Sequence, residues 1–136
     1  MKIFICASKH FYDQIPPIKK ALEDVGHVIT LPNSYDHPTR EFEMKALSPE
    51  EHSKWKGEML RLQGQKVSAV DAILVLNMEK NGIKNYIGGA TFLEIFKAFE
   101  LEKKIYVYND LPEGIFKDEL LGMTPIVING NLRLVI

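Results

Sequence analysis

The sequence predicts an α/β fold: a flavodoxin-like or Rossmann-like three-layer sandwich built on a five-stranded parallel sheet. Two observations lead to this. Short, nearly continuous apolar segments recur along the chain, and segments with helical periodicity or helix-capping signals separate them. Strands that helices cover on both faces have this apolar character. With right-handed connections, the expected strand order is 2-1-3-4-5.

Five segments have the composition of buried strands. They are 2–7, 27–32, 71–77, 105–109 and 125–129. The third, DAILVLN, is the most apolar, and we expect it at the centre of the sheet.

Four segments are expected to be helical, namely 13–25, 48–68, 89–103 and 115–121. Pro16 and Pro17 suit the first turn of the first helix, and Gly26 is a stop signal at its end. The second helix begins with a capping-box pattern, Ser48 followed by Glu51. These local signals agree with the periodicity.

Residues 33–47 are polar and are expected to be an irregular connection. Its Asp36, His37 and Arg40 have two interpretations, a lid that closes over a ligand or a solvated loop.

Length and composition predict one domain spanning residues 1–136. A formal net charge of −1 is not typical of proteins that bind nucleic acid. The single cysteine, Cys6, is expected to be a core thiol in a reduced, cytoplasmic protein. No apolar run reaches the length of a membrane span, and the histidines lack metal-ligand spacing, so we expect neither membrane association nor a metal.

The topology also predicts where a ligand binds. In this sheet order the switch point lies between the first and third strands, beyond their carboxyl ends. The loops 8–12 and 77–89 converge there, followed by the glycines Gly88 and Gly89 at a helix start. Glycines permit close approach to the backbone, and free N–H groups at a helix start attract anions.

Glu94, in the second turn of that helix, has two interpretations: an exposed carboxylate favoured by the helix dipole, or a partly buried catalytic group. A helical wheel places the core face at Phe92, Ile95, Phe96 and Phe99. Glu94 then points away from the core. A second apolar side, with Leu93, Ala98 and Leu101, predicts a homodimer or higher homo-oligomer.

The segments KIFICAS, DAILVLN and GGATFLEIFKAFELEKKIYVY resemble the nucleoside 2-deoxyribosyltransferase family, including the related deoxynucleoside 5′-monophosphate N-glycosidases. The family signature is a glycine-led helix with a glutamate, an alanine and a lysine. Gly89, Glu94, Ala98 and Lys103 or Lys104 stand in comparable places. The detailed match covers residues 71–108.

The resemblance implies that Glu94 attacks C1′ of a nucleoside or nucleoside 5′-monophosphate and displaces the base as a glycosyl-enzyme ester forms. Water or a second base then resolves the ester, without a cofactor or metal. Gly88 and Gly89 would lie near sugar or phosphate. The first loop would contact the sugar or base through Ser8, His10 and Tyr12.

Two further residues complete the predicted substrate-binding set. Asn77 ends the third strand at the site edge, and Asn109 ends the fourth, where the resemblance implies a contribution to a neighbouring subunit's site. Asp110 is a weaker candidate.

The sequence departs from the family at residues 81–87, which contain no acid to protonate the leaving base, so Asn85 or Tyr86 would have to substitute. An alternative function is therefore a non-catalytic nucleotide-binding or sensing domain. A structural oligomerisation domain is the third possibility.

Three other residues are expected to be structural. Asp71 begins a strand at the wrong end of the sheet for chemistry, and His27 begins another. Trp55 is assigned to packing or a subunit contact rather than to stacking on a ligand.

Overall fold

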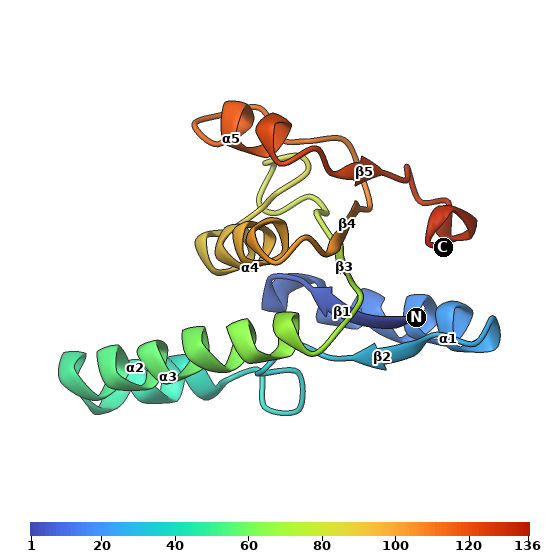
Figure 1. Ribbon diagram of the computed structural model, residues 1–136. Helices are drawn as coiled ribbons and strands as arrows, with labels where there is room; N and C mark the ends of the chain where they lie inside the picture. Colours follow the sequence, from blue (N-terminus) through green and yellow to red (C-terminus); the bar gives the residue numbers. More distant parts are fainter.

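The computed structural model describes all residues from Met1 to Ile136 and contains one five-stranded sheet (Figure 1). All neighbouring strands are parallel, in the order β2-β1-β3-β4-β5. The predicted fold class and strand order are confirmed.

The strands are short. They are β1 (Lys2–Cys6), β2 (Val28–Thr30), β3 (Ala72–Val75), β4 (Lys104–Val107) and β5 (Ile126–Val127). In the central pairs, Cys6 is opposite Val75 and Val75 is opposite Val107. The carboxyl ends of β1, β3 and β4 therefore form one even edge.

Helices cover both faces of the sheet. They are α1 (Ile15–Asp24), α2 (Arg40–Leu47), α3 (Pro49–Ser68), α4 (Gly89–Glu100), α5 (Lys117–Gly122) and the 3₁₀ helices η1 (Lys9–Gln14) and η2 (Leu132–Leu134). One core lies between the sheet and α3, α4 and α5, and the other packs α1 and the C-terminal segment against the opposite face. The architecture is a three-layer sandwich.

The predicted start of α3 is confirmed. The Ser48 hydroxyl accepts a hydrogen bond of 3.0 Å from the Glu51 amide, and Pro49 occupies the first turn. At the end of α1 the chain turns through Gly26, whose φ of +95° is unfavourable for residues with a Cβ.

The prediction of an irregular connection over residues 33–47 is wrong in its second half, which forms α2. No residue of α2 is buried, so the sequence lacks the apolar periodicity that marks most helices. The helix packs on the N-terminal half of α3, and the pair extends beyond the sheet (Figure 1). Glu41 joins them, 2.9 Å from His52 Nε2 and 3.2 Å from Lys56 Nζ.

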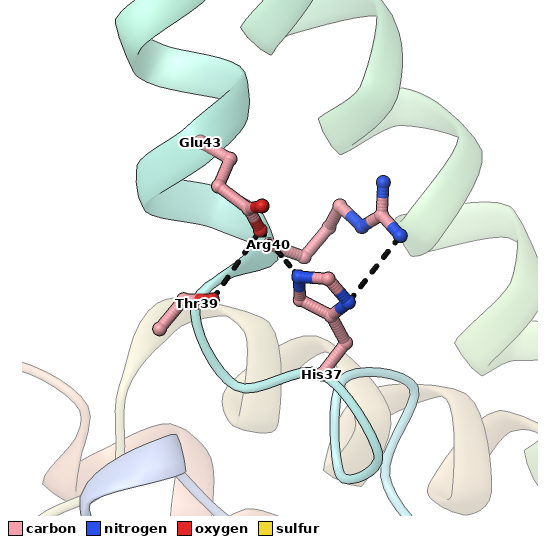
Figure 2. A network of polar contacts seen from close by, with 4 residues as sticks. All are labelled: His37, Thr39, Arg40 and Glu43. Atoms are coloured by element: carbon pink, nitrogen blue, oxygen red, sulfur yellow. Dashed lines mark hydrogen bonds and ion pairs between the residues drawn. The ribbon is translucent and has the colours of Figure 1, made fainter.

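The loop before α2 is held by a surface network (Figure 2). His37 pairs with Glu43 through Nε2, Thr39 donates to Glu43 at 3.3 Å, and Arg40 lies 3.5 Å from His37 Nδ1. These contacts tie the loop to the first turn of α2. His37 and Arg40 interact with each other rather than with a cavity.

The predicted core face of α4 is right for Ile95, which is buried, and for Phe92, which packs against the core, but wrong for Phe96 and Phe99. Phe96 and Phe99 are 49% and 46% exposed, whereas the buried residues are Thr91, Glu94, Ile95 and Ala98. The helix is apolar on most sides, so periodicity did not identify the side that meets the sheet and α3. On the second side, Leu93 and Leu101 are exposed as expected, while Ala98 lies in the core.

Asp71, His27 and Cys6 have the structural places that the sequence predicted. The Asp71 carboxylate accepts a 2.8 Å hydrogen bond from the Lys2 amide, which joins the starts of β1 and β3. His27 lies 3.0 Å from the terminal amine of Met1 and 3.1 Å from the Val135 carbonyl. Cys6 is fully buried in the core. No helix has both the length and the apolar character needed to cross a membrane.

Replacing the α3 cap tests how far the α2–α3 pair depends on it. Ser48→Ala removes the acceptor for the Glu51 amide, so we expect the free energy of unfolding to fall by about 1 kcal/mol. Urea denaturation measures the change. Ser53→Ala, at an exposed position inside the same helix, is the matched control and should cost nothing. Equal effects of the two substitutions would contradict a capping role.

Candidate functional site

A cavity of about 440 Å³ lies at the carboxyl end of β1, the region where the sequence predicted a ligand site. Its walls come from the loops after β1, β2 and β3, from α2 and α3, and from the start of α4. Ser8, His10, Tyr12, Gly88 and Gly89, five of the predicted substrate-binding residues, line it together with Glu94.

The α3 helix forms one wall because it is longer than the sheet it covers. Its 20 residues span about 30 Å. Val67 near its end packs in the core, while Gln63, Met59 and Trp55, at successive steps of four towards its start, line the cavity. One helical face thus changes from core to cavity wall.

The start of α4 forms an adjoining side, since Gln63 on α3 donates a hydrogen bond to the Ala90 carbonyl. Gly88 is the N-cap residue in extended conformation, and a Cβ there would lie 3.2 Å from the Tyr86 hydroxyl. Gly88 therefore makes room for Tyr86. Beside Gly89 nothing lies within 4 Å of a Cβ position, so its surroundings are open.

Glu94 is the buried carboxyl of the cavity, only 7% exposed. Burial raises its pKa to about 8, against the opposing effects of the Cys6 hydrogen bond and the charges of Lys66 and Lys56. The carboxyl is therefore mostly protonated at neutral pH. The interpretation of Glu94 as an exposed surface carboxylate is excluded.

Cys6 and Lys66 lie near Glu94 and partly offset the rise in its pKa. The pKa of the Cys6 thiol is raised by its burial and by the adjacent Glu94, so the thiol stays neutral. Lys66 donates a 2.8 Å hydrogen bond to the Leu31 carbonyl, and desolvation lowers its pKa although Glu94 opposes that change. Lys66 is the nearby cation that favours the ionised form of Glu94.

The cavity lining carries more cations than anions. Lys9, Lys45, Lys56 and Lys80 line it, with Glu41 and Glu94 as the acids. Burial acts to raise the pKa of Glu41, but the His52 hydrogen bond and Lys56 outweigh it and hold that pKa below its ordinary value. Because Glu41 is paired and Glu94 is mostly neutral, the balance favours an anionic ligand.

The residues of the first loop have distinct properties. Partial desolvation and the charges of Lys80 and Lys9 lower the pKa of His10, so it is neutral at pH 7. Burial, with Glu94 and Glu41 nearby, raises the pKa of Tyr12 to about 12. Both side chains are uncharged and can donate hydrogen bonds to a ligand.

Asn77 and Asn109 do not line the cavity. Asn77 donates to the carbonyls of Asn109 and Asp110 at 3.2 and 2.9 Å and accepts from the Asn109 amide at 2.8 Å. The Asn109 side chain donates to the Asn77 carbonyl at 3.1 Å. These bonds join the ends of β3 and β4, so both asparagines are structural here.

Of the two residues that the sequence offered in place of the missing acid, the structure brings only Tyr86 to the cavity. Lys80 Nζ lies 3.5 Å from its hydroxyl and 4.5 Å from its ring centre. Asn85 adopts a φ of +56° and lines a separate hollow beside Asp110.

Sequence reasoning missed most of the polar cavity residues outside the first loop and the start of α4, among them Asn33, Gln63 and Lys80. It also assigned Trp55 to packing or a subunit contact, whereas Trp55 lines the cavity. The spacing of four between Trp55, Met59 and Gln63 was the available signal, because it aligns an aromatic and an amide on one helical face.

Comparison with protein-family models and with curated proteins found no match to this chain. No three His, Cys, Asp or Glu side chains lie close enough together to form a candidate metal site.

The buried carboxyl makes a prediction about stability. Between about pH 4.5 and 8 the folded chain holds a proton on Glu94 that the unfolded chain has released, so stability falls as pH rises through this range. Glu94→Gln removes this loss. Relative to wild type, we expect the variant to gain roughly 2–4 kcal/mol on going from about pH 5 to pH 9.

Urea denaturation of both proteins at the two pH values measures this difference. Glu100→Gln, an exposed carboxylate on the same helix, is the control and should show little pH-dependent gain. A gain that is the same at both pH values would contradict a raised pKa of Glu94.

Proposed function

We propose that this chain cleaves or transfers the N-glycosidic bond of a nucleoside or nucleoside 5′-monophosphate, with Glu94 as the nucleophile. The observation that carries the proposal is a buried carboxyl, 7% exposed, at a cavity of about 440 Å³ beyond the end of β1. A carboxylate in a site that limits water is suited to attack on an oxocarbenium-like carbon. The resemblance of residues 71–108 to the deoxyribosyltransferase family supports the same assignment.

The proposed reaction has two steps. A Glu94 carboxylate oxygen bonds to C1′ while the C1′–N bond breaks, and its electron pair leaves with the base. Water or a second base then attacks C1′, which releases the carboxylate. Because only the ionised carboxyl attacks, and its pKa is about 8, the reaction should speed up as pH rises towards that value.

The surplus of lysines favours substrates that carry a phosphate. Lys9 and Lys80 belong to the segments that bracket the start of α4, where the Gly88–Gly89 backbone is open. A 5′-phosphate placed there would meet two cations and unpaired helix N–H groups. We therefore place nucleoside 5′-monophosphates ahead of nucleosides as substrates.

Release of free base from matched nucleosides and nucleoside 5′-monophosphates tests the proposal, with chromatographic detection. We expect Glu94→Ala to lower release by about 10³-fold or more while binding survives, because a nucleophile acts mostly in the transition state. Release by wild type should rise with pH up to about pH 8. Glu100→Gln is the control that should keep wild-type release.

The alternative is a nucleotide-binding or sensing domain without turnover. Two observations favour it: Glu94 is mostly protonated at neutral pH, and no acid lies in residues 81–87. In that case some member of the panel should raise the melting temperature of wild type and of Glu94→Ala, with no base released. If no member of the panel releases base and none shifts the melting temperature, both functions are contradicted.

We also propose that the chain forms a homo-oligomer through the outer side of α4. Leu93, Phe96 and Phe99 are exposed there, and the first two line a hollow between α3 and α4. Contiguous exposed apolar side chains of this kind are typical of protein interfaces. Gln63 and Glu94 line both this hollow and the cavity, so a second copy would also shield Glu94 from its outer side.

Light scattering coupled to gel filtration tests this assembly. We expect wild type to be a dimer or larger, and Phe96→Lys to shift it to monomer because a charge would be buried at the contact. Ile115→Lys, at a position 87% exposed and far along the chain, should leave the mass unchanged. A dissociation constant above about 100 μM is weak for a specific interface, so a wild type that is monomeric at about this concentration would contradict the proposal.

A further inference from the structure

Two side-chain amides on the cavity wall are held in a fixed orientation. Gln63 Nε2 donates a 3.0 Å hydrogen bond to the Ala90 carbonyl, and Asn33 Nδ2 donates a 2.9 Å bond to the Met59 carbonyl. A backbone carbonyl only accepts, so in each amide the NH₂ group must face it. The oxygen of each amide therefore points elsewhere.

Neither oxygen has a donor in the chain. Asn33 Oδ1 is buried without any hydrogen-bond partner, the one such side-chain atom in the structure. Gln63 is only 8% exposed, and its one side-chain hydrogen bond is the bond to Ala90. A buried acceptor such as Asn33 Oδ1 is nearly always paired, and leaving it unpaired costs free energy, whereas Gln63 Oε1 is an unpaired acceptor that is not fully enclosed. The wall therefore has two acceptor oxygens without donors, and a ligand with N–H groups could supply those donors.

Neighbouring cations do not fill this role. Lys66 is directed to the Leu31 carbonyl, and Lys56 pairs with Glu41. Both amides are neutral acceptors, and they suit neutral N–H donors.

The same wall has a flat apolar component. Met59 and Trp55 lie about one and two helical turns before Gln63 on α3, and all three line the cavity. The His52 ring stacks on Trp55 at 6.2 Å and 29°, which fixes the indole. An indole beside a thioether is a suitable surface for a planar heterocycle.

We propose that Asn33, Trp55, Met59 and Gln63 form a subsite for a planar heterocycle with an exocyclic amino group, and that they select amino-bearing over oxo-bearing bases. This inference rests on the proposed function for the class of ligand. An amino group of the kind found in adenine or cytosine supplies two N–H donors. The oxo group of hypoxanthine or uracil would set an acceptor against these oxygens and leave them unpaired.

The test uses free bases, because their binding does not depend on cleavage of a glycosidic bond. Calorimetry with the full chain compares adenine with hypoxanthine and cytosine with uracil, pairs that differ at one amino or oxo position and its ring proton. We expect the amino member of each pair to bind on the order of tenfold more tightly, or better.

Three variants assign the preference to the wall. Gln63→Met keeps the length but has no strong acceptor, so the preference should fall to about equal affinity. Gln63→Leu, which removes both the acceptor and the donor to the Ala90 carbonyl, should lose the preference in the same way. Gln65→Met, an exposed position on the same helix outside the cavity, should behave as wild type.

Equal affinity within both wild-type pairs, tighter oxo members, or no binding of any base at millimolar concentration would each overturn the proposal, as would a preference that survives Gln63→Met. If that variant does not fold, the wild-type pairs still decide. Amino-base preference without base release from any nucleotide would leave this subsite standing while the proposed reaction fails. Equal release of amino-bearing and oxo-bearing bases from their nucleotides would support the proposed reaction and contradict this subsite.

Discussion

The burial of one carboxyl group is the constraint on which the site depends. Glu94 is on the side of α4 that meets the sheet and α3, and that contact removes it from water and raises its pKa to about 8. Lys66 and the Cys6 thiol offset only part of this cost. An apolar side chain at this position would fit the core without a desolvation penalty, so the arrangement exchanges stability for a reactive group, as functional sites often do.

Glu94 lines a cavity because α3 is long enough to extend beyond the sheet and form one of the cavity walls. A helix that ended with the sheet would leave the carboxyl ends of β1 and β3 open to solvent, as a shallow edge. Instead α3 continues beyond the sheet, where α2 packs against it through Glu41, His52 and Lys56. The otherwise exposed polar helix α2 therefore supports the wall that faces Glu94.

The sequence was sufficient for the sheet, its strand order and the capped start of α3, because each depends on local patterns or on a general topological rule. It was insufficient where burial is decided by segments distant in sequence. Apolar residues on most sides of α4 left its core face ambiguous, and only contact with α3 shows that Glu94 is inside while Phe96 is outside. The Asn77–Asn109 bonds join strand ends 32 residues apart, and no local signal distinguishes such a pair from ligand-binding amides.

In the proposed function, different parts of the cavity lining would select the base and deliver a proton to it. Gln63 and Asn33 cannot protonate a leaving base, since their NH₂ groups are bound to backbone carbonyls and their oxygens only accept. Glu41 is paired and ionised, and a pKa of about 12 makes Tyr12 a poor acid. In the proposed reaction, proton delivery therefore falls to the loop after β3, where the Tyr86 hydroxyl is next to Lys80, or to water. If the proposed function and subsite hold, the wall of Asn33, Trp55, Met59 and Gln63 holds no acid, so changes to it should alter which heterocycle binds without changing how its bond is broken.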